Sequence, residues 1–173
     1  MTTRWQMLAG YNACANERVY ENAAKLSDVD YRADLGAFFK SVHGTLNHLL
    51  ATDRIWMRRF TGEGEAPTRL DAIFFESFED LRAARADEDA RIIAFIGGLD
   101  GVRLSSKLSY RAISQPVQFE QELAPALAHF FNHQTHHRGQ LHYLLTGLVG
   151  AAPELDLPIY QRVHSLGGTR QVA

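Results

Sequence analysis

Residues 120–147 read EQELAPALAHFFNHQTHHRGQLHYLLTG, and this stretch indicates the fold more clearly than any other. Its apolar residues recur at steps of three and four, the spacing of one face of an α-helix. Pro125 is tolerated only within the first turn or so of a helix, so regular hydrogen bonding should begin near Leu123 or Ala124. The stretch therefore predicts a long helix whose apolar face packs in a core.

Three further segments show helical spacing, at about residues 3–26, 33–60 and 77–97. The second of them carries a wide apolar stripe, made of Phe38, Phe39, Val42, Leu46, Leu49, Leu50, Trp56 and Phe60. The third begins with Ser77 and two acidic residues, as a helix N-terminus favours, and ends at Gly97. Four long helices joined by connections of unequal length predict an all-α four-helix bundle.

The segments that follow the third and fourth helices differ in character. Between Val102 and Phe119, apolar residues are separated by polar ones, which favours a short hairpin or an irregular connection. Beyond Gly150, two prolines predict an irregular tail. We expect one domain at residues 1–157 and a C-terminal tail at 158–173 that is disordered from about residue 167.

Composition limits the classes of partner. The chain has 173 residues, 46% of them apolar, which is enough for one domain with a core but short for two. A net charge of −2 without basic runs argues against nucleic acid, and no segment approaches the ~20 apolar residues that span a bilayer. Asn12, Asn16 and Glu17 interrupt any apolar signal core. The solitary Cys14, expected as a small packed side chain, fits a reducing compartment. We expect a soluble, cytoplasmic protein.

Two histidines interrupt the core face of the last predicted helix. His133 and His137 are four residues apart, so they differ by only ~40° around the helix axis and ~6 Å along it, and both can face one ion. A buried polar group without a partner costs roughly 1–3 kcal/mol, and a metal bond would satisfy one nitrogen of each ring. The other nitrogen would donate a hydrogen bond that fixes the tautomer. Metal binding is therefore the leading hypothesis.

Two ligands from one helix do not make a tight site, because catalytic zinc usually has three protein ligands. His129 lies ~12 Å along the axis from His137, too far to share an ion easily with both of its successors. His136 is rotated ~100° from His137 and should face solvent or a neighbouring chain. His48 flanks the apolar stripe of its helix and could face a water-containing cavity. Spacing leaves the third ligand open among His43, His48, His129, His136, His142 and His164.

Two familiar metal motifs are excluded. The zinc-protease pattern requires a glutamate directly after the first histidine as general base, and Gln134 occupies that place. Di-iron bundles require Glu-x-x-His pairs, and no histidine has a glutamate three residues before it. Neither peptide hydrolysis by a zinc-protease site nor ferritin-like chemistry is expected.

Two segments resemble a known family. Residues 132–140, NHQTHHRGQ, are similar to the signature of the DinB family, within the superfamily of DinB and YfiT-like metalloenzymes. Residues 44–56, GTLNHLLATDRIW, resemble the family's other histidine-bearing segment, and the likeness covers about residues 5–157. It implies an up-down-down-up four-helix bundle, often a homodimer, with a divalent ion, nickel or zinc. By position, the implied ligands are His48, His133 and His137.

The resemblance also implies a class of chemistry. In related branches the metal is thought to activate a low-molecular-weight thiol for transfer or isomerisation, which needs no strong adjacent base and is compatible with Gln134. Activation of water is the competing route and would benefit from a proton acceptor such as Asp53, Glu120, Glu122 or His129. Arg138 could hold a substrate carboxylate or form an interhelix salt bridge, and Asp53 is expected to pair with Arg54, Arg58 or another bundle residue.

These features fit two functions. The first is a metal-dependent enzyme, a thiol transferase or hydrolase of a small molecule, with Arg138, Asp53 and His129 as candidate catalytic residues. The second is a non-catalytic, stress-related dimeric binding module whose metal is structural or absent. Five aromatic residues at helical spacing could wall a pocket and are given no catalytic role: Tyr11, Trp56, Phe130, Phe131 and Tyr143.

Overall fold

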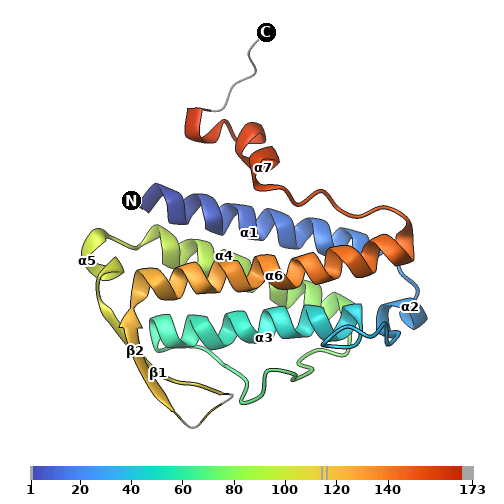
Figure 1. The fold of residues 1–173 in the computed structure, drawn as a ribbon, viewed down its shortest axis with the longest axis horizontal. Coiled ribbons are helices and arrows are strands. Elements are labelled where there is room, and N and C mark those ends of the chain that lie inside the picture. Colours follow the sequence, from blue (N-terminus) through green and yellow to red (C-terminus); the bar gives the residue numbers. More distant parts are fainter. Residues whose placement is uncertain (1, 114, 116, 169–173) are drawn as a thin grey trace.

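The computed structural model describes residues 2–113, 115 and 117–168, and its elements are mostly helices (Figure 1). Two strands, β1 (Lys107–Arg111) and β2 (Gln118–Glu122), form an antiparallel hairpin. The helices are α1 (Thr2–Ala23), α2 (Asp28–Arg32), α3 (Val42–Thr61), α4 (Phe78–Gly97), α5 (Gly101–Leu104), α6 (Leu123–Val149) and α7 (Leu157–Val163), with a 3-10 turn at Leu166–Gly168. The prediction of a helical protein with a hairpin before the last long helix is confirmed.

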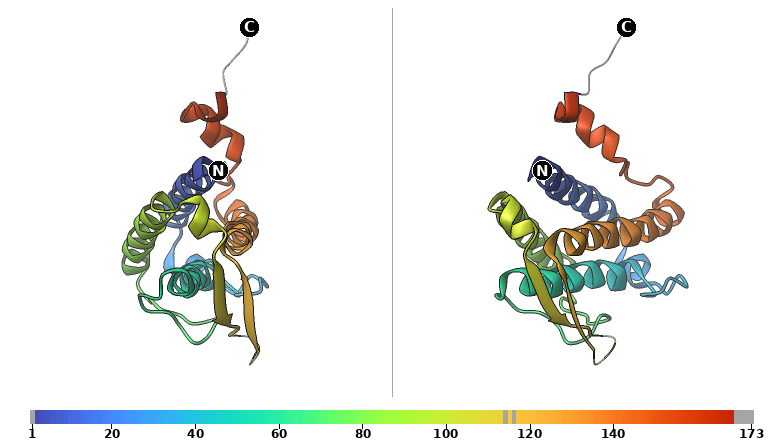
Figure 2. Two further views of the ribbon diagram at one scale, coloured as in Figure 1. Left: turned by 90° about the vertical axis from the view of Figure 1, so that its left-hand side faces the viewer. Right: turned by 60° about the vertical axis from the view of Figure 1, so that its left-hand side comes forward.

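The four long helices lie side by side (Figures 1 and 2). In Figure 1, α1 and α6 run in one direction and α3 and α4 run in the other, as the colours along each helix show. All four contribute to each of two apolar clusters. The first cluster includes Trp5, Phe60, Ile92 and Phe130. The second cluster includes Val19, Leu46, Leu81 and Leu141.

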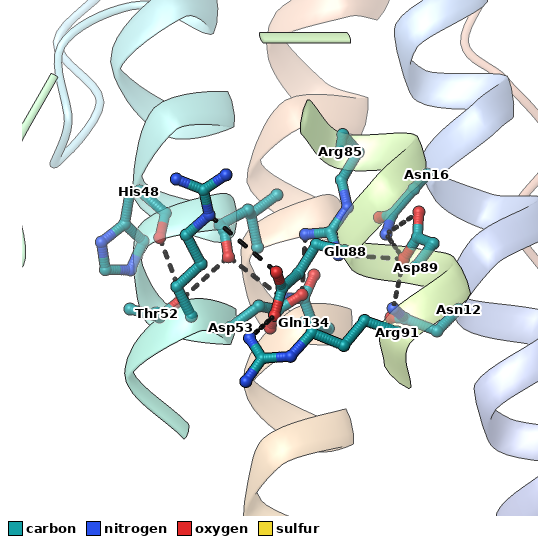
Figure 3. A network of polar contacts seen from close by, with 12 residues as sticks. Asn12, Asn16, His48, Thr52, Asp53, Arg85, Glu88, Asp89, Arg91 and Gln134 are labelled. Atoms are coloured by element: carbon teal, nitrogen blue, oxygen red, sulfur yellow. Dashed lines mark hydrogen bonds and ion pairs between the residues drawn. The ribbon is translucent and has the colours of Figure 1, made fainter. Parts of the chain in front are cut away.

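A layer of buried polar side chains separates the two apolar clusters, and we call it the polar layer. Each long helix contributes to it, with Asn12 and Asn16 from α1, Asp53 from α3, Arg85 and Asp89 from α4, and Gln134 and Arg138 from α6. Figure 3 shows most of these side chains pointing toward one another between the helices. Their bonds cross the protein interior and join all four long helices.

Helix boundaries follow local signals. The Ser77 side chain accepts a hydrogen bond from the backbone N–H of Asp80, so the predicted start of α4 is confirmed, and α4 ends at Gly97 as predicted. The first residue of α6 is Leu123, as Pro125 indicates. The broader expectation of a helix from residue 120 is wrong, because residues 120–122 pair with β1.

The prediction of one helix over residues 33–60 is wrong in its first third, because α3 begins at Val42. Lys40 has a φ of 67°, which breaks helical geometry, and the Ser41 side chain caps α3 by accepting from the backbone N–H of Gly44. Phe38 and Phe39 therefore lie outside the helix whose stripe they were expected to extend. Phe38 is 83% exposed.

The C-terminal segment is more regular than expected. An α-helix, α7, occupies Leu157–Val163, with Asp156 at its N-cap position and Pro158 in its first turn, an ordinary start signal. Tyr160 packs edge-on against Tyr11 of α1. Figure 1 shows α7 above α1, outside the group of four long helices. Residues 167 and 168 belong to the 3-10 turn, and the rest of the predicted disordered segment, 169–173, lies outside the described residues. In the described part of the chain, no helix has the length and apolar character required to cross a membrane.

Candidate metal centre

Three histidine rings converge between α3 and α6. His48 comes from α3, His133 and His137 come from α6, and one ring nitrogen of each lies within 4.8 Å of the others. The Nε2 atoms of His48 and His133 are 3.3 Å apart. Two imidazole nitrogens bound tetrahedrally to one zinc ion, each at 2.0–2.1 Å, are about 3.3–3.4 Å apart. The spacing of these two nitrogens thus fits a shared ion.

Hydrogen bonds to the outer nitrogens fix the orientation of two rings. His48 Nδ1 lies 2.7 Å from the carbonyl oxygen of Leu70, which can only accept, so Nδ1 carries the proton and Nε2 has a free lone pair. His137 Nδ1 lies 2.8 Å from Gln140 Oε1, and the Gln140 amide nitrogen lies 3.4 Å from His136 Nε2. Buried histidine ligands commonly have such an outer acceptor. In both rings the Nε2 atom is left for the metal.

Phe39 covers the cluster on one side. Its ring stacks on that of His48, with centroids 3.7 Å apart and planes inclined by 17°, and it meets the His137 ring edge-on at 5.5 Å. The segment before α3 therefore contributes a side chain to the site although it is not helical. This contact limits the movement of the His48 ring and excludes water from one face of it.

The three rings are neutral at physiological pH. Burial, together with the neighbouring histidines, lowers the pKa of His48 to about 4 and that of His133 to about 3. Burial also lowers the pKa of His137. Metal ligation requires the unprotonated imidazole. Protons therefore compete weakly with a metal ion for this site.

We expect the metal-free protein to lose stability on mild acidification. In the unfolded chain these histidines have a pKa near 6.5, so between about pH 6.5 and 4 the unfolded state binds more protons than the folded state, and stability falls as pH falls. Thermal unfolding of the chelator-treated protein, followed at steps from about pH 7 to 5, measures this loss. A double variant, His48→Asn with His133→Asn, should have a flatter profile, and an unchanged slope would contradict the assignment.

Arg138 and Asp53 lie in the polar layer and not at the histidines. Arg138 is 2% exposed and donates to Asn12 Oδ1 at 2.5 Å and Asn16 Oδ1 at 3.1 Å. The expected interhelix salt bridge of Arg138 is not formed, because within the described residues it has only neutral partners. A role of Arg138 toward a substrate carboxylate stays a prediction. Asp53 pairs with Arg85 of α4 at 2.7 Å and accepts from Gln134 (Figure 3). Of the three expected alternatives, pairing with another residue of the long helices is confirmed, whereas Arg54 and Arg58 are not its partners.

A pocket of about 250 Å³ opens beside His48 and His133. His129 lines it, with its ring centroid 5.1 Å from that of Trp56 and 5.9 Å from that of His133. Burial and the nearby Arg59 lower the pKa of His129. Glu120 and Glu122 do not line the pocket. The lining residues are His48, Thr52, Ile55, Trp56, Arg59, Leu70, Tyr110, Ala112, Ile113, Phe119, His129 and His133.

The other predicted residues have separate places. The ring of His136 packs edge-on against His137 at 4.7 Å and is exposed, as expected. His43 is buried and lies 3.0 Å from the carbonyl of Phe75. His142 and His164 are exposed and lie outside the group of three. Of the five candidate aromatic wall residues, Trp56 lines this pocket, whereas Phe130 and Phe131 pack in the first apolar cluster.

Sequence reasoning missed three contributors to the site. Gln140 is three residues after His137, a spacing at which helical side chains meet, so this partner could have been found. Phe39 was assigned to a helix stripe, and the contact made by Leu70 is a backbone carbonyl of a loop. Neither has a signal in the sequence.

The family model described as DinB family matches residues 1–170. The chain belongs to the DinB family. Protein DinB of Bacillus subtilis (strain 168) is a distant relative, 23% identical over 159 residues that cover 87% of this chain and 89% of the relative. The resemblance based on the two histidine-bearing segments is therefore confirmed. In this DinB-family chain the same two segments supply the three converging rings, and their role as metal ligands stays a prediction.

Proposed function

We propose that this DinB-family protein binds one divalent ion, nickel or zinc, through His48, His133 and His137 and uses it in chemistry on a small molecule. The observation that carries the proposal is the convergence of three neutral imidazoles from two helices beside a pocket. The proposal includes the up-down-down-up bundle expected of the family, since α1 and α6 run against α3 and α4 (Figure 1).

The reaction we propose is transfer to or from a thiol, with hydrolysis as the second possibility. A bound divalent ion would lower the pKa of a coordinated thiol or water. His129 is the residue that can accept the released proton, because it lines the pocket and its lowered pKa keeps a ring nitrogen free. Among the described residues that line the pocket there is no carboxylate, which favours a thiol over the less acidic water.

The alternative is a non-catalytic, stress-related dimeric module with a structural metal. One surface feature favours a homodimer in either case. Phe38 and Tyr143 are 83% and 79% exposed, and both line a shallow depression together with Leu35 and His136. Exposed aromatic residues grouped in this way are typical of protein contacts.

Metal removal separates the two functions. We expect the purified protein to contain about one ion per chain, and the chelated protein to remain folded, because both apolar clusters are independent of the histidines. Addition of metal at about 1,000 times its dissociation constant should stabilise the fold by ~4 kcal/mol, visible as a higher melting temperature. The cobalt-loaded protein should develop thiolate absorption when a small thiol is added.

Two other results would support the non-catalytic alternative. Unfolding upon chelation would identify the ion as structural. A purified protein without stoichiometric metal, which also binds none when dialysed against zinc, nickel or cobalt, would leave the binding module as the function. Circular dichroism of the chelated sample distinguishes a folded but inactive protein from an unfolded one.

A further inference from the structure

Arg59 lies at the far end of the pocket, on the same face of α3 as His48. The two residues are eleven positions apart, which is close to three full turns, so they differ by only ~20° around the helix axis. Thr52, Ile55 and Trp56 lie between them on this face and also line the pocket. Helical side chains lean toward the N-terminus, and the Arg59 guanidinium accordingly lies over the ring of Trp56, one turn nearer to His48. The pocket therefore has the histidine group at one end and a guanidinium at the other.

Within the described residues, the Arg59 guanidinium contacts neutral groups. Its Cζ atom is 4.5 Å from the ring centroids of both Trp56 and Tyr110, and Nη2 donates to the backbone carbonyl of Arg111 at 3.0 Å. Among the described residues no carboxylate forms an ion pair with Arg59. The side chain is half-buried, and burial lowers its pKa. A partly desolvated charge without a counter-ion is unfavourable unless a ligand supplies one.

Two arginines of α4 show the contrast. Arg85 pairs with Asp53 and Asp89, and Arg91 pairs with Glu88. Arg59 differs from these in lining a pocket while lacking a carboxylate. Stacking on two aromatic rings explains how its position is fixed, because each such contact stabilises by roughly 0.5–1 kcal/mol. Within the described residues, the Nε and Nη1 donors of Arg59 make no hydrogen bond.

The lining of the pocket defines the ligand that would fit. Among the described lining residues Arg59 is the charged one, and the walls between it and the histidines are aromatic and aliphatic apart from Thr52, whose hydroxyl bonds to backbone carbonyls of its own helix. A single guanidinium matches a single negative charge, which favours a carboxylate over a phosphate monoester with a charge near −2. The volume of about 250 Å³ lies just below the ~300–1,000 Å³ typical of drug-sized ligand sites. The ligand is thus a small molecule with an apolar middle.

We propose that Arg59 binds the carboxylate of a small molecule whose other end reaches the His48, His133 and His137 group. This inference rests on the proposed metal site and adds the substrate class: a compact monocarboxylate with a metal-binding group, such as a thiol, at its opposite end. Arg59 is a specificity-determining residue in this account, since it selects a substrate and takes no part in bond making.

The test uses the full chain loaded with cobalt and a set of synthetic thiols. Mercaptoacetate, mercaptobutanoate and mercaptohexanoate are each compared with the amide of the same length, and thiolate-to-cobalt absorption measures each dissociation constant. The wild type should prefer a carboxylate over its amide by about 10-fold at one chain length, as expected for a charged hydrogen bond. Arg59→Gln should abolish that preference and leave the affinity for the amide within about 2-fold. Arg59→Lys should retain part of the preference, because it keeps the charge without the planar fork.

The matched control for Arg59→Gln is the same substitution at Arg58. Arg58→Gln removes the same charge from the neighbouring, exposed position on α3 and should retain the wild-type preference. If cobalt and thiols bind but Arg59→Gln leaves the carboxylate preference unchanged, or if the wild type has no preference at any length, the role of Arg59 is wrong and the metal site stands. If cobalt does not bind to the wild type, the metal site and this inference both fail. Melting temperatures of the variants show whether each is folded.

Discussion

Replacement of His48 by alanine is expected to abolish stoichiometric metal binding. The two remaining ligands, His133 and His137, come from one helix, whereas a catalytic site normally holds its ion with three protein ligands. Loss of a residue that only supports a ligand already costs 10–100-fold in affinity, so loss of a ligand should cost at least ~100-fold. Metal analysis after gel filtration, together with titration by isothermal calorimetry, measures the change.

His129→Ala is the matched control for this variant. It removes a histidine from the same pocket, next to His133, but outside the group of three converging nitrogens. Its metal content should equal that of the wild type, while thiol transfer slows if His129 accepts the proton. Equal metal affinity for His48→Ala and the wild type would remove the basis of the proposed centre.

Asp53→Ala should destabilise the fold by ~3–5 kcal/mol, the cost of removing one partner from a buried ion pair. Asp53 is 1% exposed. Its carboxylate accepts hydrogen bonds from Arg85 Nη1, at 2.7 Å, and from the side-chain amide of Gln134. Without it, a guanidinium and an amide donor lose an acceptor in the interior, where water cannot replace it. Since domains of this size are stable by about 5–15 kcal/mol, urea unfolding should show a large shift in midpoint.

An exposed ion pair provides the comparison for Asp53. Asp71 pairs with Arg69 at 2.8 Å at the surface, and the energy of such a pair is ~0–1 kcal/mol. Asp71→Ala should therefore unfold at nearly the wild-type urea concentration. If the two variants lose similar free energy of unfolding, burial does not make the Asp53–Arg85 pair more important for stability than an exposed pair.

Much of the fold could be predicted because helix ends have local signals. Ser77 and Pro125 set the starts of α4 and α6 through a side-chain cap and a missing N–H, both properties of single residues. The segment before α3 could not be predicted in this way. Phe38 and Phe39 continue the helical spacing of apolar residues, but periodicity does not distinguish a helix from a loop that packs on the same core. A left-handed Lys40 decides the matter, and such a conformation has no strong sequence signal in lysine.

The part of the site that depends on local spacing was also predictable. His133 and His137 are neighbours on one helix, so spacing alone pairs them. His48 is 85 residues from His133, and only the packing of α3 against α6, or resemblance to a family, selects it among the other histidines. Arg138 follows His137 directly in the chain but does not lie at the histidines. A helix rotates ~100° per residue, and that rotation directs Arg138 toward α1.

Gln134 has a consequence for how the two histidine-bearing helices are aligned. It lies beside His133 on α6, and its amide donates to Asp53 and to the carbonyl of Leu49, which is next to His48 on α3. Apolar helix faces can slip along each other by one turn, ~5.4 Å, and still bury similar area, whereas the same slip here would strand several charges in the interior. These bonds favour a single register of α3 on α6, and in that register the His48 and His133 imidazoles of the two helices lie at coordination distance, with their Nε2 atoms 3.3 Å apart.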